Sequence, residues 1–381
     1  MTSPRWTTRL LAALAAGVVL LVSGCGSGEQ QNPYGQRIQG TGVSTGAPLL
    51  PEGDSWDELG TAGTDEGVRV YTVERDLGTD VTISVTAPTT PGADDGLQVQ
   101  LTDAAGNRCS SAAASSYASA RDPVMSATVE STRREGDQCL TATRLLLSLS
   151  RSGEAEQATQ VRIRLFTVAG VEDKDYPDYD VEHQLSPISV GNSTPGEPGS
   201  WLDDAQVLEP DQTVSGSIGT GVLHTYRIGL EWGQGMQVQL VFPDPPPTVR
   251  EQVGEAGLRG GLYLVNPAGE FGSLNPVWLS PGGATDATLD PAFYVSRSLA
   301  NLPGYYTLVV SVSSTKETTA VLPYQLIASP FGATNNGLGP QVVYATSSSG
   351  LPEGVLWSML VVGVLLIIAG MAQVTLHRQQ H

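Results

Sequence analysis

Positive charge, aromatic rings and histidine are all scarce in this chain of 381 residues. Lysine occurs only as Lys174 and Lys316, and acidic residues outnumber basic ones 39 to 20. The resulting formal charge of −19 repels polyanions, which counts against nucleic acid and anionic lipid head groups as partners. Aromatic residues make up 6% of the chain, and a glycosidase cleft needs more of them than this.

The shortage of histidine removes most hydrolase mechanisms. Only His183 and His224 lie between the two apolar ends of the chain. His183 falls in a polar stretch where a solvated side chain is expected, and His224 falls on an expected strand with its side chain turned outward. We find no Gly-x-Ser-x-Gly elbow, Walker loop, nucleotide fingerprint or metalloprotease histidine pair. We therefore predict that the protein is not an enzyme.

The N-terminus has the pattern of an export signal. Arg5 and Arg9 precede an apolar run over 10–22, and Ser23-Gly24-Cys25 follows it. This ending resembles the lipobox of bacterial lipoproteins, in which Cys25 would be acylated. Cleavage a few residues later, which discards Cys25, is the alternative.

The C-terminus predicts a membrane anchor. Residues 355–376 form a run of 22 residues without a formal charge, long enough to cross a hydrocarbon core of roughly 30 Å. Together with the export signal, this run places the N-terminus outside and the short tail 377–381 in the cytoplasm. We predict a single-pass protein of the cell membrane with its ectodomain outside the cell.

Cys109 and Cys139 are the remaining cysteines, 30 residues apart in the exported region. An oxidising compartment favours their pairing, so we predict a disulfide. Two separate thiols are the alternative, and a zinc site lacks nearby histidine ligands.

The ectodomain carries an internal repeat. Its segments alternate apolar and polar residues, favour Val, Ile, Thr and Tyr, and end at glycine or proline turns, as β-strands do. Five segments correspond between the halves: 68–73 with 223–228, 81–85 with 236–240, 97–106 with 262–269, 145–150 with 308–313, and 161–166 with 324–328. Trp56 and Trp201 also look equivalent, and we expect each to fill the core of its half.

This pattern predicts an all-β fold with two tandem antiparallel β-sandwich domains, jelly-roll-like, followed by a C-terminal transmembrane helix. The expected divisions are a signal segment at 1–24, a flexible tether at 25–53, a first sandwich at 54–170, an acidic and proline-rich linker at 171–199, a second sandwich at 200–330, a second tether at 331–354, the transmembrane helix at 355–376, and the tail at 377–381.

The second half resembles the prepeptidase C-terminal (PPC-like) type of β-sandwich, found on secreted bacterial peptidases and surface proteins. The matching positions are Trp201, Asp204, Ala205, Gly216, Tyr226, Gly233, Leu262, Gly269, Tyr305 and Tyr306. Residues 54–170 fit more loosely, and Arg69 and His224 stand where the family often has an acidic residue. The chain also resembles single-span actinobacterial surface proteins of unassigned role.

Calcium is the one cofactor that the sequence suggests. Hard cations take six to eight oxygen ligands, and the acidic linker 172–182 supplies carboxylates. Asp203 and Asp204 stand where some relatives of this domain bind calcium, so they are the candidate ligands. A solvated linker and a strand cap are the alternative reading of these two places.

These observations predict a non-catalytic envelope protein that binds or scaffolds another envelope protein or a cell-wall polymer. Edge strands and loops of a sandwich are the natural contact surfaces. A structural spacer or assembly subunit beside a membrane partner is the alternative, and a secreted-type hydrolase is a third, weaker one.

Overall fold

A computed structural model describes residues 35–90, 92–116, 123–131, 139–169, 188–243, 258–273, 302–314 and 318–332, with short pieces at 247, 249, 277–278, 293–294 and 334. Within these ranges, no helix combines the length and the apolar character that a membrane span requires. The predicted signal segment, Cys25, His183 and the predicted transmembrane helix lie outside the described residues.

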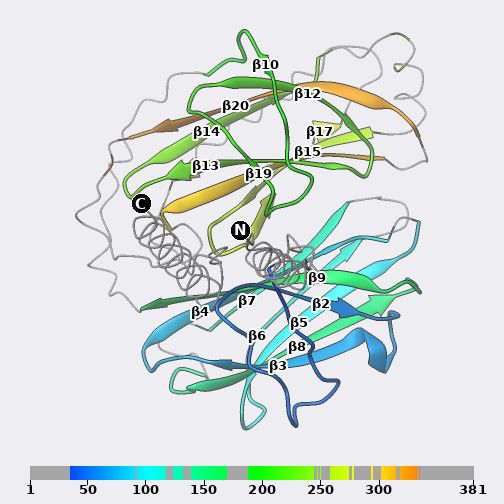
Figure 1. The fold of residues 1–381 in the computed structure, drawn as a ribbon, viewed down its shortest axis with the longest axis vertical. Helices are drawn as coiled ribbons and strands as arrows, with labels where there is room; N and C mark the ends of the chain where they lie inside the picture. The colour runs from blue at the N-terminus through cyan, green and yellow to red at the C-terminus, as the bar shows by residue number, and fades with distance from the viewer. Residues whose placement is uncertain are drawn as a thin grey trace, which may run out of the picture.

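The N-terminal half folds into two sheets, which we call the N-sandwich (Figure 1). One sheet has the order β1-β2-β9-β4-β7 and the other the order β3-β8-β5-β6. The strands are β1 (Gln36–Arg37), β2 (Gly53–Leu59), β3 (Val68–Glu74), β4 (Thr79–Pro88), β5 (Asp95–Asp103), β6 (Arg108–Ser116), β7 (Val124–Ser131), β8 (Arg144–Gly153) and β9 (Thr159–Ala169), with a 3-10 turn η1 (Asp65–Gly67) before β3.

The C-terminal half forms a second pair of sheets, the C-sandwich. Their orders are β10-β12-β20-β14-β18 and β11-β13-β19-β15-β16, with β17 paired to β15. The strands are β10 (Thr194–Pro195), β11 (Gln206–Val207), β12 (Thr213–Gly219), β13 (Leu223–Leu230), β14 (Gly235–Val241), β15 (Leu258–Val265), β16 (Phe271–Ser273), β17 (Val277–Trp278), β18 (Phe293–Tyr294), β19 (Gly304–Ser314) and β20 (Val321–Phe331).

The two sandwiches share one strand order. The N-sandwich has eight strands beyond β1, and their pairing is that of a double-sheet jelly roll. In the C-sandwich, β12 to β16 and β18 to β20 repeat this pairing, and β11 and β17 are added to it. The all-β prediction is confirmed, and the repeat read from the sequence corresponds to strands in equivalent places of the two sheets. The purely antiparallel prediction is wrong at the edges, where β1, β10 and β11 pair in parallel with β2, β12 and β13.

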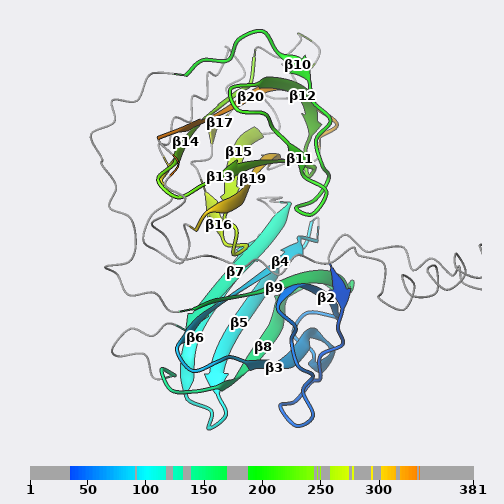
Figure 2. The same ribbon diagram turned by 60° about the vertical axis from the view of Figure 1, so that its left-hand side comes forward.

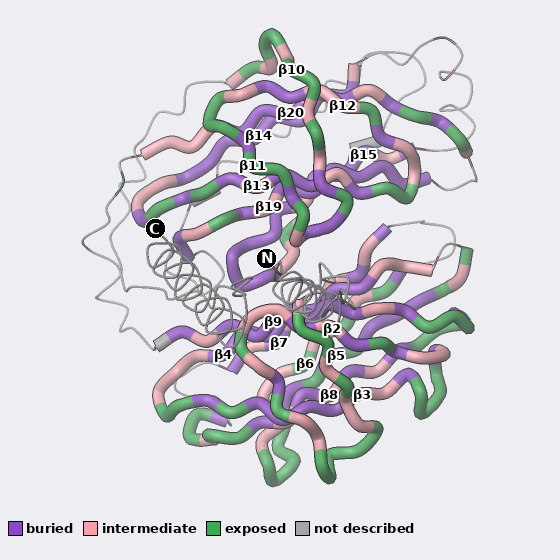
Figure 3. The backbone as a smooth tube through the Cα atoms, viewed as in Figure 1, coloured by how far each residue is buried: buried purple, intermediate pink, exposed green. Residues whose placement is uncertain are grey.

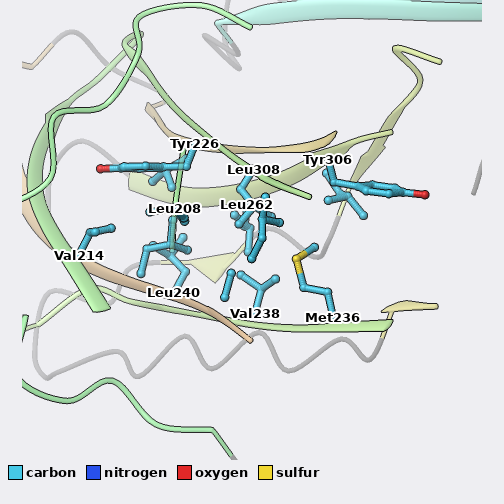
Figure 4. Close-up of a cluster of buried hydrophobic side chains, with 14 of the residues drawn as sticks. Leu208, Val214, Tyr226, Met236, Val238, Leu240, Leu262, Tyr306 and Leu308 are labelled. Atoms are coloured by element: carbon cyan, nitrogen blue, oxygen red, sulfur yellow. The ribbon is translucent and has the colours of Figure 1, made fainter. Parts of the chain in front are cut away.

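Alternation along the strands builds each core. In β9 the side chains of Val161, Ile163 and Leu165 point inward and are buried, as they are along the inner faces of the other strands (Figure 3). In the C-sandwich, aliphatic side chains fill the space between Tyr226 and Tyr306, whose hydroxyl groups point away from the cluster at its opposite ends (Figure 4).

Both sandwiches begin earlier than predicted. Residues that we expected in the tether 25–53 belong to the N-sandwich, because the backbone N–H groups of Ile38 and Leu50 donate to Trp56 and Thr72 at 2.9 and 2.8 Å. In the same way, β10 and a bridge from Gly199 to Thr225 take residues from the predicted linker 171–199. Polar, glycine-rich sequence here covers sheet edges instead of forming a tether.

The four sheets stack in one direction (Figures 1 and 2). The sheet that contains β9 and β4 lies between the rest of the N-sandwich and the sheet of the C-sandwich that contains β13, β19 and β15. The outer face of the β9 sheet, which the alternation predicts to be wet, is therefore partly covered by the other sandwich.

Candidate functional site

The first calcium candidate, Asp204, closes a tight turn before β11. Its Oδ2 accepts from the backbone N–H and the hydroxyl of Ser200 at 3.0 and 2.8 Å, and its Oδ1 accepts from the Trp201 N–H at 2.7 Å. Burial alone would raise the pKa of Asp204, but these donors outweigh it and lower the pKa. The arrangement is that of a turn cap, in which local N–H groups occupy both carboxylate oxygens.

The second candidate, Asp203, points the other way and reaches the N-sandwich. Its Oδ1 lies 3.1 Å from Nη2 of Arg162 on β9, and the same nitrogen lies 2.8 Å from Oδ1 of Asp54 on β2. Arg164, two residues along β9, lies 3.3 Å from Oδ2 of Asp54. We call Asp54, Arg162, Arg164 and Asp203 the junction cluster.

The junction cluster sits out of water. The Arg162 side chain is only 4% exposed, and those of Asp54 and Asp203 are 16% and 20% exposed. Burial lowers the pKa of Arg162, but the carboxylates of Asp54 and Asp203 outweigh this and raise the pKa. Burial raises the pKa of Asp203 to about 6, although the Arg162 charge acts to lower it.

Apolar contacts surround the junction cluster. Trp201 and Leu202 pack with Leu223, Val265 and Val309 on the outer face of the C-sandwich. Val124 on β7 and Phe271 on β16 join the same group of side chains, so the group includes residues of both sandwiches.

The turn between β15 and β16 comes closest to the other sandwich. Gly269 has a φ of +87°, and a Cβ at this place would lie 3.0 Å from Cδ of Arg164 and 3.2 Å from Cβ of Ser84. A side chain here would strain the turn and press on the neighbouring sheet. Phe166 and Val168 on β9 extend the contact, since they belong to the same apolar cluster as the C-sandwich core.

This site is a structural joint more than a reactive centre. Its carboxylates and guanidinium groups neutralise one another across two elements of one sandwich and one loop of the other. Sequence reasoning missed Arg162 and Arg164, although their alternation with Val161 and Ile163 had placed them on a polar face. The two arginines can be recognised as site residues only from their contact with Asp203, which lies some 40 residues further along the chain.

The predicted disulfide is confirmed. Cys109 and Cys139 are bonded, with 5.4 Å between their Cα atoms. The guanidinium group of Arg75 fixes the segment that carries Cys139, because it donates to the backbone carbonyls of Cys139, Ala142 and Ser131. Residues 108–116 form strand β6 on the other side of the bridge.

His224 does not point outward as expected. It shares a face of β13 with Tyr226, and its Nδ1 lies 2.8 Å from the Tyr324 hydroxyl, which lies 2.6 Å from the Tyr226 hydroxyl. Burial lowers the pKa of His224, which keeps the ring neutral. The histidine therefore ends a chain of hydrogen bonds inside the C-sandwich.

Trp56 and Trp201 are not equivalent, contrary to the sequence-based expectation. The strand that contains Trp56 corresponds to β12, whereas Trp201 precedes β11. Trp56 lies on the outer face of β2 under the guanidinium group of Arg37, at 5.0 Å, and does not fill a core. The expectation rested on the Ser-Trp pair that occurs in both halves, but the two pairs lie in different places because the loops around them differ in length.

In the part of the chain that the structure describes, no group of three or more His, Cys, Asp or Glu side chains is arranged to hold a metal ion. The acidic linker 172–182 lies outside the described residues.

Comparisons with known proteins give no family. No family model and no curated protein matches the chain. Among solved structures, it is similar to the CBM22-1–CBM22-2 tandem domain of Xyn10C from Paenibacillus barcinonensis, with 13% identity and a TM-score of 0.21 over 73% of this chain and 93% of that one. It is also similar to the empty top component of cowpea mosaic virus, with 8% identity and a TM-score of 0.20 over 83% and 97%. Both TM-scores are low, and neither likeness carries weight for fold or function.

Proposed function

We propose that this chain is a non-catalytic cell-envelope protein whose paired sandwiches bind or scaffold another envelope protein or a cell-wall polymer. The observation that carries the proposal is the junction cluster. Because Asp203 of one sandwich is bonded to Arg162 of the other at 3.1 Å in a largely buried site, both halves can present their loops to one partner in a fixed relation. A fixed relation lowers the entropy that such binding costs.

The buried ionisable groups support a non-catalytic role. Asp95 binds Arg151, Asp57 accepts from Tyr71, and His224 binds Tyr324, each at 2.8 Å or less. Groups that are engaged in this way contribute to the stability of the fold.

The localisation of the protein in the cell membrane is part of the proposal. The export signal, Cys25 and the apolar run 355–376 would hold the sandwiches outside the cell, with the C-terminus in the cytoplasm. The PPC-like resemblance belongs to the same proposal, since such domains are appended to secreted and surface proteins. Replacing Cys25 by serine tests the lipid anchor, because radiolabelled fatty acid should then no longer be incorporated.

Cross-linking of the full chain in intact envelopes, followed by purification and mass spectrometry, tests the function. We expect cross-links from the sandwiches to one partner, and we expect them to persist when residues 355–376 are replaced by an unrelated single-span helix. Loss of the partner on that exchange would favour the assembly-subunit alternative. Hydrolytic turnover that disappears in His224→Gln would contradict the non-catalytic proposal.

A further inference from the structure

Two carboxylates, one from each sandwich, converge on a single guanidinium nitrogen. Nη2 of Arg162 lies 2.8 Å from Oδ1 of Asp54 and 3.1 Å from Oδ1 of Asp203. The other oxygen of Asp203, Oδ2, is buried and receives no hydrogen bond from the residues that the structure describes. A buried charged oxygen without a donor is costly, and a second carboxylate across the same nitrogen adds repulsion.

The described charged groups that face Asp203 are few. Arg162 and Arg164 face it from β9, and Asp54 faces it from β2. Asp204, its neighbour in the loop, is bonded to Ser200 and Trp201 instead. If Asp203 takes up a proton, Asp54 still lies 2.8 Å from Arg162 and 3.3 Å from Arg164, so neither guanidinium group is left without a carboxylate.

We propose that the junction takes up a proton at Asp203 in mildly acidic solution, and that this proton holds the two sandwiches together more tightly. The junction would then act as an acid-stabilised joint, in which the docking of the two sandwiches is strongest when the solution outside the cell is acidic. This inference concerns the joint itself and does not depend on the partner in the proposed function.

The sign follows from linkage. Burial raises the pKa of Asp203 from its ordinary 3.8 to about 6 in the docked state, against the opposing charge of Arg162. The docked state therefore binds the proton more readily than separated sandwiches do, and docking strengthens as the pH falls toward 5 and weakens as it rises above 6. With these two pKa values, the docking constant at pH 5 is about tenfold larger than at pH 7.5.

Thiol protection in the full chain measures this equilibrium directly. Val124→Cys places a thiol on β7, where the native side chain packs against the apolar cluster that includes Trp201 and Leu202 of the other sandwich. Its labelling rate by a methanethiosulfonate, divided by the rate of a free cysteine peptide at the same pH, reports transient opening. Peptide mass spectrometry separates this thiol from Cys25 and from the disulfide-bonded pair.

We expect about tenfold greater protection at pH 5 than at pH 7.5, with level protection above about pH 7 and a rise that begins near pH 6. Asp203→Asn, which mimics the protonated side chain, should give high protection at both values. Glu209→Gln removes one exposed negative charge from the same sandwich and should leave the pH dependence unchanged.

Protection that is flat or falls in acid would overturn the proposal, as would an unchanged pH dependence in Asp203→Asn. Circular dichroism establishes that each variant is folded. If Asp203→Asn does not fold, the protection curve of the chain with native Asp203 decides, because protection must be level above about pH 7 and must rise as the pH falls below about 6. The absence of this rise refutes the joint.

Discussion

The two sandwiches have the same strand order but fill one interior position with opposite chemistry. In the N-sandwich, Arg151 on β8 and Asp95 on β5 form an ion pair at 2.7 Å with side chains that are 1% and 0% exposed. The equivalent positions on β19 and β15 hold Val312 and Leu258, which are both fully buried. One fold therefore accepts either a paired charge or an apolar pair at the same register.

A second contrast concerns the tyrosines Tyr71 and Tyr226, which occupy equivalent places on β3 and β13. The Tyr71 hydroxyl donates to Asp57 Oδ2 at 2.7 Å, whereas the Tyr226 hydroxyl meets the Tyr324 hydroxyl. The counterpart of Asp57 is Gly216, where a Cβ would lie 2.6 Å from that same Tyr324 hydroxyl. The glycine makes room for the ring that replaces the carboxylate.

Substitutions in the Asp95–Arg151 ion pair should give the largest effect on stability, and they test whether the interiors of the two sandwiches are interchangeable. Asp95→Leu alone should destabilise the N-sandwich by about 3–5 kcal/mol, because it leaves the Arg151 guanidinium buried without its counter-ion. Asp95→Leu combined with Arg151→Val reproduces the C-sandwich pair and should recover more than half of the loss. Hydrogen exchange in β5 and β8, with β15 and β19 as internal control, measures both. A double variant as unstable as the single one would show that the two interiors are not interchangeable.

The disulfide gives the next largest effect, and within the described residues it belongs to the N-sandwich. Replacing Cys109 and Cys139 together by serine should lower the stability of that sandwich by about 3–4 kcal/mol, since the unfolded chain regains the freedom of a closed loop. Denaturant unfolding of the full chain should show an earlier transition for the N-sandwich and an unshifted one for the C-sandwich. Equal shifts in both would mean that the two halves unfold as one unit.

Removing single hydroxyl groups sharpens the tyrosine contrast. Tyr71→Phe should cost about 1.5–3 kcal/mol, because it deletes a hydrogen bond to a charged carboxylate, whereas Tyr226→Phe deletes a bond between neutral phenols and should cost about 0.5–1.5 kcal/mol. Each variant is the matched control of the other, and both are compared by urea unfolding. A larger loss for Tyr226→Phe would contradict this ranking.

The smallest effect is a pH dependence confined to the C-sandwich. Burial lowers the pKa of His224 below its ordinary 6.5, so the unfolded chain binds a proton that the folded one refuses. The stability that neutral His224 contributes is present above pH 6.5 and declines as the pH falls below it. His224→Gln should flatten this decline, whereas the N-sandwich, with Arg69 in the equivalent place, should lack it. The measurement is best made in Asp203→Asn, because the junction would change stability in the opposite direction.

Much of the fold could be predicted because a strand and its buried face depend on residues that are adjacent in the sequence. Alternation such as Val161-Arg162-Ile163-Arg164-Leu165 identifies a strand and its inner face without any partner. The repeat predicted that both halves share one architecture, and two cysteines in a region predicted to be exported indicated the disulfide. The failures came where pairing is not local: residues 36–50 have the composition of a tether, yet their N–H groups complete the edges of two sheets.

The candidate site was predicted only in its location. Asp203 and Asp204 were singled out as candidate calcium ligands, but the sequence cannot tell that adjacent carboxylates point in opposite directions. One caps its own turn and the other leaves its sandwich to meet Arg162. That difference depends on the polar face of β9, which the C-sandwich, a distant part of the chain, partly covers.

The strip of Phe166 and Val168 on β9 bears on how this chain can be divided. Both side chains are 5% exposed, because they join the apolar cluster of the other half. An isolated N-terminal module would expose these hydrophobic groups to water, which makes it prone to self-association. The two halves share one strand order, but the apolar contact between them makes each half a poor candidate for independent expression.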